Sequence, residues 1–252
     1  MPLTLLYHDV VPPENAESSG FPGPGAAHYK LAPPVFREHL DAIAAVVHAP
    51  PSVDGRSGWM LTFDDGGITA LDPTADLLEQ RGWRGWFFIT TDRTGEPTFL
   101  NPDQIRELRR RGHVVGGHSC SHPPRLSYCS PEQIDREWSR SREVLTKILG
   151  EPVTSASVPG GFHSHAVARS AAAAGYKILF NSEPTSAVHM VDGCAIVGRY
   201  SIVRGTPAAT AAALAQGRLL PRLKQASLWK VKKAAKFLGG NLYLRLRSRL
   251  LK

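Results

Sequence analysis

The sequence predicts an α/β fold built on a mostly parallel sheet, either open and doubly wound or closed into a barrel. Short apolar runs alternate with amphipathic helical segments almost to the end of the chain. The 252 residues suffice for one domain with a full hydrophobic core. Polar residues suited to chemistry follow most of the apolar runs, as they do at the catalytic face of a parallel barrel.

The predicted strands are short and apolar, and in chain order they are Leu3–Tyr7, Trp59–Phe63, Trp86–Thr90, His113–Gly116, Ser155–Val158, Lys177–Asn181 and Ala195–Gly198. The predicted helices between them are Val35–Val47, Pro73–Arg81, Asp103–Arg111, Pro131–Leu149 and Ala166–Gly175. The helix from Pro131 has the clearest start, because Ser130 can cap it and proline suits its first position. Residues 12–29 are rich in Gly, Pro and Ser and predict a long loop at a functional rim.

The composition is that of a soluble globular protein, with 42% hydrophobic and 21% charged residues. The start of the chain shows neither the basic leader nor the long apolar run of a signal peptide. Three cysteines argue against a disulfide framework and suit a reducing compartment. We therefore expect a cytoplasmic location, with peripheral attachment to the inner face of the membrane as the alternative.

Basic residues are concentrated in the last quarter of the chain. Residues 193–252 contain thirteen Lys and Arg and no Asp or Glu, whereas residues 1–192 contain 17 basic and 22 acidic residues. The tail 229–252 mixes aromatic residues and leucines with basic residues at helical spacing, which is typical of a helix in a membrane interface. Packing on the barrel with the basic face in water is an equal alternative. We expect no nucleic-acid partner, because no nucleic-acid-binding motif accompanies the charge.

Two short motifs carry the residues with the clearest chemistry. In MLTFDDG, Asp64 and Asp65 directly follow a predicted buried strand, where adjacent carboxylates are costly. In HSCSH, the i, i+4 spacing of His118 and His122 brings two imidazoles together if a helical turn follows the strand. Two histidines and one carboxylate are typical of a catalytic metal centre with an open position. Cys120, between the histidines, is expected to be a small buried residue facing away.

TFDDG and HSCSH, in this order and about 53 residues apart, resemble the first two motifs of the polysaccharide deacetylases, the NodB-homology group or carbohydrate esterase family 4. LLYHDV, SVPGG, FNSEP and GRYSI follow the same family pattern. The resemblance covers roughly residues 1–205 and leaves residues 206–252 as a basic helical C-terminal extension. It implies a distorted (β/α)7-type barrel, a divalent metal, and hydrolysis of an N-acetyl or sometimes O-acetyl group on a sugar.

The resemblance also implies roles for residues. Asp65, His118 and His122 would hold the metal, with zinc expected ahead of cobalt, manganese or nickel. Asp64 would be the general base that activates a metal-bound water. The expected substrate-binding residues are Thr91, Pro159, Gly160 and Gly161.

Two departures from the family pattern shift attention to other residues. The arginine expected before Pro159 in the third motif is absent. Arg199 is the candidate to replace it by reaching Asp64, and a surface ion pair is the alternative. The late Leu-x-x-His motif is also absent. We expect His8 to serve as the general acid, because a closed barrel places its first strand beside its last, and His163 is the second choice.

The predicted function is therefore metal-dependent removal of an N-acetyl group from an amino sugar in a glycan or a lipid-linked saccharide. The carbohydrate substrate is the expected partner. A glycan-binding barrel without turnover and a deformylase of a lipid-linked amino sugar are the alternatives.

Overall fold

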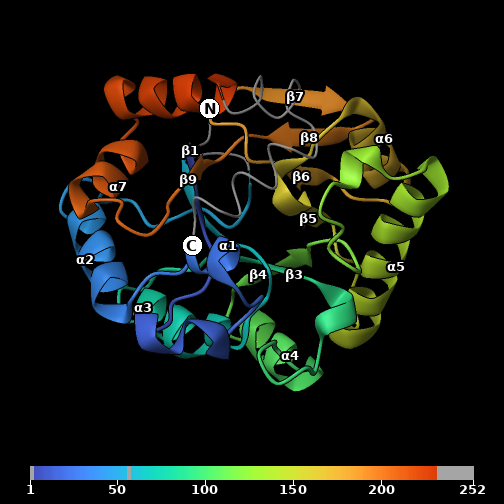
Figure 1. Ribbon diagram of the computed structural model, residues 1–252, viewed down its shortest axis with the longest axis horizontal. Coiled ribbons are helices and arrows are strands. Elements are labelled where there is room, and N and C mark those ends of the chain that lie inside the picture. Colours follow the sequence, from blue (N-terminus) through green and yellow to red (C-terminus); the bar gives the residue numbers. More distant parts are fainter. Residues whose placement is uncertain (1–2, 56–57, 232–252) are drawn as a thin grey trace.

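The computed structural model describes residues 3–55 and 58–231 of the chain. Within them the strands form one sheet that curves into a distorted barrel, with the helices around its outside (Figure 1). The strands are β1 (Leu3–Tyr7), β2 (Trp59–Phe63), β3 (Trp86–Ile89), β4 (Val114–Gly117), β5 (Ser155–Ser157), β6 (Ile178–Phe180), β7 (Val188–Val191), β8 (Cys194–Val197) and β9 (Tyr200–Ser201).

The α-helices are α1 (Pro24–Ala27), α2 (Pro33–Ala44), α3 (Asp76–Glu79), α4 (Pro102–Arg110), α5 (Pro131–Leu149), α6 (His165–Ala173) and α7 (Ala208–Ala215), and residues 219–231 are also helical. Shorter helical turns are η1 (Pro13–Ser18), η2 (Ile68–Ala70), η3 (Leu71–Ala75), η4 (Thr91–Arg93), η5 (Leu126–Tyr128) and η6 (Pro159–Gly161). Among the described residues, no helix is both long enough and apolar enough to cross a bilayer.

One interrupted strand closes the barrel. The sheet order is β7-β8-β6-β5-β4-β3-β2-β1-β9, and every pair is parallel except β7 with β8. Only Gly198 and Arg199 separate β8, which pairs with β6, from β9, which pairs with β1. A side chain at position 198 would meet the Glu183 carbonyl oxygen at 2.4 Å, so the break needs glycine. The predicted α/β barrel is confirmed.

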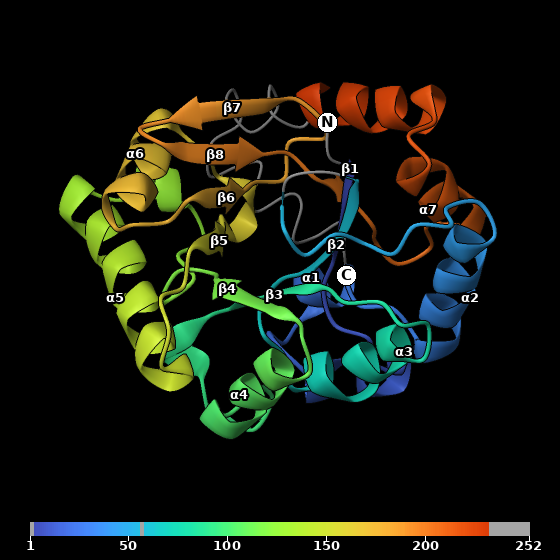
Figure 2. The same cartoon turned by 180° about the vertical axis from the view of Figure 1, so that it is seen from behind.

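The seven strands expected from the sequence are present, with ends that differ by at most one residue. The sequence did not indicate β7 and β9. The helix expected at Pro73–Arg81 is α-helical only over Asp76–Glu79, because η3 forms a wider π turn with non-helical angles at Asp72. The long loop expected after β1 contains two short helices, η1 and α1. The view from behind shows the parallel strands side by side inside the ring of helices (Figure 2).

The apolar residues divide into two clusters on the two sides of the sheet. The larger cluster packs the outer face of the strands against the helices and includes the stacked rings of Tyr7, Phe63 and Phe87. The smaller cluster comprises Met60, Trp86, Phe88, Phe180 and Val197. Since strand side chains alternate between faces, this second cluster fills the barrel interior.

The outer helices are fixed by local signals and by packing. Ser130 caps α5 by accepting a hydrogen bond from the Gln133 N–H, and Gly150 ends it in the left-handed conformation. The helix α7 packs against α2 and β1. The domain boundary at residue 205 stays a prediction. Of the basic extension expected at 206–252, residues 232–252 lie outside the described part of the chain.

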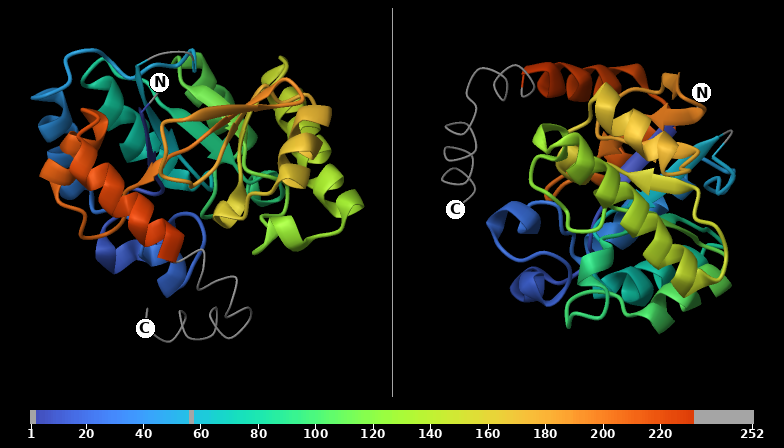
Figure 3. Two further views of the ribbon diagram at one scale, coloured as in Figure 1. Left: turned by 90° about the horizontal axis from the view of Figure 1, so that it is seen from above. Right: turned by 90° about the vertical axis from the view of Figure 1, so that its right-hand side faces the viewer.

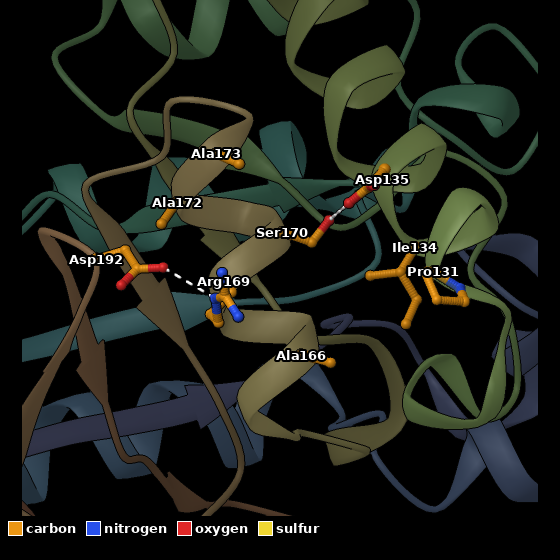
Figure 4. Close-up of a pocket in the computed structure, with 9 residues that line it drawn as sticks. All are labelled: Pro131, Ile134, Asp135, Ala166, Arg169, Ser170, Ala172, Ala173 and Asp192. Atoms are coloured by element: carbon orange, nitrogen blue, oxygen red, sulfur yellow. Dashed lines mark hydrogen bonds and ion pairs between the residues drawn. The ribbon is translucent and has the colours of Figure 1, made fainter.

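A shallow pocket of about 530 Å³ lies between α5 and α6 (Figure 4). Two polar pairs border it, Ser170 with Asp135 and Arg169 with Asp192. None of the candidate catalytic residues lines it.

We expect Gly116→Ala to lower the free energy of unfolding by about 1–3 kcal/mol, because the added methyl overpacks the barrel. It would lie 2.6 Å from both Phe88 Cε1 and the Ser155 carbonyl oxygen. The matched control is Gly25→Ala, since nothing lies within 4 Å of a methyl there. Urea unfolding of both variants measures the difference, and equal midpoints would contradict the packing described for β4.

A buried histidine makes the stability of the fold depend on pH. His113 Nδ1 accepts the Gly85 N–H at 3.1 Å, and Nε2 lies 2.8 Å from a Glu79 carboxylate oxygen. The imidazole is therefore neutral and carries its proton on Nε2. Burial lowers the pKa of His113 below its ordinary value, although Glu79 acts in the opposite direction.

We therefore expect the free energy of unfolding to fall as the pH drops from about 7 to about 5. In this range the unfolded chain, with a histidine pKa near 6.5, takes up the proton that the folded chain resists. Asparagine can keep the acceptor without the titration, so His113→Asn should show a shallower pH dependence in urea unfolding. An unchanged slope would show that other groups, such as the buried His39, cause the effect.

Candidate active site

The end of β2 delivers Asp64 and Asp65 to one end of the barrel, and both side chains are buried. The Asp64 N–H still donates to the Tyr7 carbonyl in the manner of the sheet, at 3.1 Å. Asp65 and Gly66 then both adopt positive φ angles, 79° and 78°. This sharp turn separates the two adjacent carboxylates and lets them meet different partners.

Asp64 forms a two-point ion pair with Arg199, whose side chain has no exposed surface. Arg199 Nη1 donates to Oδ1 at 2.7 Å and Nη2 donates to Oδ2 at 2.8 Å. Ser157 Oγ donates to Oδ2 at 3.1 Å, and Arg199 Nε donates to the Asn181 carbonyl at 2.9 Å. The guanidinium also lies near the faces of two rings of the interior cluster, those of Phe88 and Phe180.

These contacts decide the protonation state of Asp64. Burial by itself would raise the pKa of this carboxyl group, but the Arg199 guanidinium and, to a smaller extent, His118 bring it below its ordinary value. Asp64 is thus held as a carboxylate in a fixed orientation. Oδ1 accepts one hydrogen bond, from Arg199, and so keeps a second lone pair that can take another proton, whereas Oδ2 already accepts from both Arg199 and Ser157.

Asp65, His118 and His122 bring one ligand atom each to a common point. All three atoms lie within 4.8 Å of one another. Asp65 Oδ1 is 3.4 Å from His118 Nε2 and 3.7 Å from His122 Nε2. His118 Nδ1 lies 3.0 Å from the Ser157 carbonyl oxygen, which can only accept, so Nδ1 carries the proton.

The donor set fits a divalent cation. With Nδ1 protonated, Nε2 of His118 faces the Asp65 carboxylate, and a neutral imidazole can face a carboxylate in this way only with a proton or cation between them. Burial alone would lower the pKa of His118, but the Asp64 and Asp65 carboxylates raise it above its ordinary value, so this position favours a positive charge. Burial and the neighbouring His118 lower the pKa of His122 to about 4, which leaves its imidazole neutral and able to ligate. Two imidazoles and one carboxylate form a set that zinc accepts.

The HSCSH segment approaches the site as a bend, which corrects the helical turn considered from the sequence. Ser119 and His122 have positive φ angles of 60° and 58°, and Asp65 shares this conformation. Among the described residues, the one other non-glycine residue with positive φ is Asp192. Such strain is concentrated at functional sites, and something must hold it in place.

Glu137 of α5 holds this bend. One carboxylate oxygen accepts the N–H groups of Cys120 and Ser121 at 2.9 Å, and the other accepts the Ser121 hydroxyl. Cys120 is buried, as expected from the sequence. The sequence analysis missed Glu137, although a signal exists. It lies three residues after Ile134 and directly before Trp138, on the buried face of an otherwise amphipathic helix.

A cavity of about 1610 Å³ opens above these groups. Of the residues expected from the sequence, those that line it are Asp64, Asp65, His118, His122, His8, Gly160, Gly161 and His163. The His8 ring lies against that of Tyr29, with the ring centroids 4.7 Å apart and the planes tilted. Arg199 lies beneath the floor of the cavity and holds Asp64 in place through their ion pair.

Thr91 and Pro159 are not among the residues that line the cavity, and their assignment as substrate-binding residues stays a prediction. Both are buried. The Thr91 N–H donates to the Ser119 carbonyl at 3.3 Å, so it supports the HSCSH bend and is not free to bind a substrate oxygen. Pro159 begins the η6 turn, which presents the two following glycines instead.

A buried lysine anchors the long loop that forms one cavity wall. Lys30 Nζ donates to three carbonyls of the loop, those of Ala16, Ser19 and Phe21, and lies 4.0 Å from a carboxylate oxygen of buried Asp9. The Phe21 ring packs against the imidazole of His122, with centroids 4.6 Å apart. The loop thus covers the outer ligand of the cation site. The sequence analysis did not identify Lys30, because its partners are carbonyls that no side-chain pattern reveals.

The polysaccharide deacetylase family model matches residues 53–179, which contain Asp64, Asp65, His118 and His122. The chain belongs to the polysaccharide deacetylase family. Members of this family are generally metal-dependent, in agreement with the Asp-His-His cluster.

Curated relatives of the polysaccharide deacetylase family match over part of their length. A chitin deacetylase of Colletotrichum lindemuthianum is 35% identical over 77 residues, which are 30% of this chain and 31% of that protein. A peptidoglycan-N-acetylglucosamine deacetylase of Bacillus cereus is 30% identical over 120 residues, 47% of this chain and 54% of that protein. The matched region therefore spans about a third to a half of these relatives.

Solved structures, among them one of a polysaccharide deacetylase, share the fold. A polysaccharide deacetylase of Bacillus cereus superposes with a TM-score of 0.70 at 17% identity, covering 84% of this chain and 68% of that one. IcaB of Ammonifex degensii gives a TM-score of 0.66 at 22% identity, covering 85% and 97%. The distorted barrel of the family is thus also the fold of this chain.

We expect Arg199→Met to lower the free energy of unfolding by about 3–5 kcal/mol, because it leaves the Asp64 carboxylate buried without its partner. Adding Asp64→Leu should recover a large part of this loss, since the unpaired charge is then gone. Urea unfolding of the single and double variants measures both. The control is Arg169→Met, which removes an exposed ion pair with Asp192 and should cost about 1 kcal/mol or less. A double variant no more stable than the single one would contradict the ion-pair interpretation.

Proposed function

We propose that this chain is a metal-dependent hydrolase that removes the N-acetyl group from an amino sugar in a glycan or a lipid-linked saccharide. One observation carries the proposal. A carboxylate fixed by a buried arginine, that of Asp64, stands beside a three-ligand cation site on the floor of a large cavity. A site that only binds glycan has no need of a free base next to a cation.

Asp65, His118 and His122 would hold the cation, and zinc is the first choice for this donor set. A bound divalent cation supplies a Lewis acid that lowers the pKa of water and polarises a carbonyl group. The protein's own residues would move the protons. The metal identity and the cytoplasmic location stay predictions.

Asp64 would accept a proton from the attacking water while the water oxygen bonds to the acetyl carbonyl carbon. Arg199 keeps Asp64 ionised and aims it, so little reorganisation is needed. When the C–N bond breaks, the amine nitrogen must gain a proton, and acetate and a free amine leave. His8 is our candidate donor because it lines the cavity and its Nδ1 is buried without a hydrogen-bond partner among the described residues.

The cavity supports a saccharide as substrate. Its volume of about 1610 Å³ exceeds the roughly 300–1,000 Å³ usual for small ligands. Aromatic side chains of the lining, among them Phe21, Tyr29 and Phe162, offer apolar faces with polar groups between them. Two relatives are named as deacetylases of chitin and of peptidoglycan N-acetylglucosamine, and these names support an N-acetylated amino sugar as the substrate.

We expect the purified protein to release acetate from N-acetylglucosamine-containing oligosaccharides only after loading with a divalent metal. Stripping the metal should abolish release, and zinc, cobalt or manganese should restore it. Asp64→Asn should reduce turnover by about 10²–10⁴-fold, because it removes the proton acceptor. Acetate is measured enzymatically after each treatment.

Metal binding is measured separately by equilibrium dialysis with zinc. His118→Ala should abolish stoichiometric binding, whereas His189→Ala, which removes an exposed histidine of β7, should not. Bound metal without acetate release from any substrate would overturn the deacetylase proposal. It would favour a glycan-binding barrel or hydrolysis of another acyl group such as formyl, and formate release tests the latter.

A further inference from the structure

The helix formed by residues 219–231 is attached to the barrel through its polar side chains. Arg222 donates to the Tyr200 hydroxyl at 2.8 Å and to Ser186 Oγ at 2.7 Å. Gln225 donates to the Ser201 carbonyl at 2.9 Å. These contacts fix which face of the helix points toward β9.

The same helix exposes apolar side chains on its other face. The relative exposures of these residues are Leu219 63%, Leu220 82%, Leu223 53%, Leu228 52% and Val231 67%. Leu220, Leu223 and Val231 follow the i, i+3 and i+11 spacing of one helical face. An ordinary surface helix packs its apolar side inward, so this reversed arrangement indicates a surface that another apolar phase covers.

The charge of the sequence in and after this helix indicates which apolar phase covers the exposed face. Residues 218–252 contain eleven Lys and Arg and no Asp or Glu. On the helix itself, Lys224 and Lys230 are exposed beside the leucines. A protein partner would need a matching acidic and apolar surface, whereas a bilayer with anionic headgroups offers both properties by composition.

The helix is also part of the cavity wall. Its residues Pro221, Lys224, Gln225, Leu228 and Trp229 line the same cavity as Asp64 and the cation site. Leu228 belongs to both surfaces, since it lines the cavity and is half exposed. In Figure 3 this helix, drawn in red, runs along the outside of the molecule in both views.

We propose that the exposed apolar face of helix 219–231 docks on an anionic lipid bilayer and sets the cavity at the membrane surface. The side chains of Leu219, Leu220, Leu223 and Val231 enter the interface, and the lysines contact lipid phosphates. Resting on the proposed function, the substrate class that follows is an N-acylated amino sugar carried on a membrane lipid. The docking itself does not depend on catalysis.

Co-sedimentation of the full chain with vesicles tests the proposal. The vesicles are phosphatidylcholine with or without phosphatidylglycerol. We expect binding to the anionic vesicles, weakened by salt, and at least about tenfold weaker binding by Leu220→Gln/Leu223→Gln. The matched control, Val188→Gln/Met190→Gln, removes two exposed apolar side chains of β7 and should bind like the unaltered protein.

Other results would overturn the proposal. If both double variants bind equally, residues other than this helix face make the contact. If the unaltered protein ignores anionic vesicles and the leucine variant changes its mass in light scattering, a second copy of the chain covers the face. Acetate release from a soluble oligosaccharide should be equal in the leucine variant and the unaltered protein. If neither the unaltered protein nor the leucine variant releases acetate from this oligosaccharide, the result counts against the proposed function and leaves the docking proposal unaffected.

Discussion

Arg199 lies in the interior of a barrel, without exposed surface, at the break of the strand that closes it. A guanidinium in such a place is stable only if its charge and its hydrogen bonds are met. Asp64 directly after β2 meets the charge, while the hydroxyls of Ser157 and Thr62 and the carbonyl of Asn181, directly after β6, accept its remaining donors. The interaction that orients the candidate base therefore also connects the two ends of the sheet.

The cation site depends on a different kind of support. Its ligand-bearing segments contain three non-glycine residues in the left-handed conformation, Asp65, Ser119 and His122. Glu137 fixes the HSCSH bend from α5, and Lys30 fixes the loop that packs on His122. Both supporting charges are buried and satisfied mainly by backbone groups. The site is thus held from two sides by elements that do not belong to its motifs.

The sequence was sufficient for features that depend on local pattern. Seven strands and the convergence of residues that follow them could be predicted, because apolar runs and strand ends are local properties. The hairpin of β7 and β8 could have been found from Asp192-Gly193, a typical two-residue turn. The sequence analysis missed β7 because its side chains are mostly exposed and do not alternate between buried and exposed. The position of Glu137 on the buried face of α5 could have been read from the helical pattern, but its partners could not. The contacts of Glu137 and Lys30, and the position of Thr91 outside the cavity, depend on contacts between distant segments, which local pattern does not encode.

The position of Arg199 bears on how sequences of this family are compared. The arginine expected in the third motif is replaced there by small residues, and Ser157 from that motif now shares the guanidinium with Asp64. A comparison column by column would score this chain as lacking a catalytic component. The Asp64 carboxylate nevertheless has a two-point pair with an arginine, which comes from the break between β8 and β9. Whether a carboxylate of this kind has an arginine partner is therefore decided by which side chains meet in space, and the order of motifs along the sequence does not reveal it.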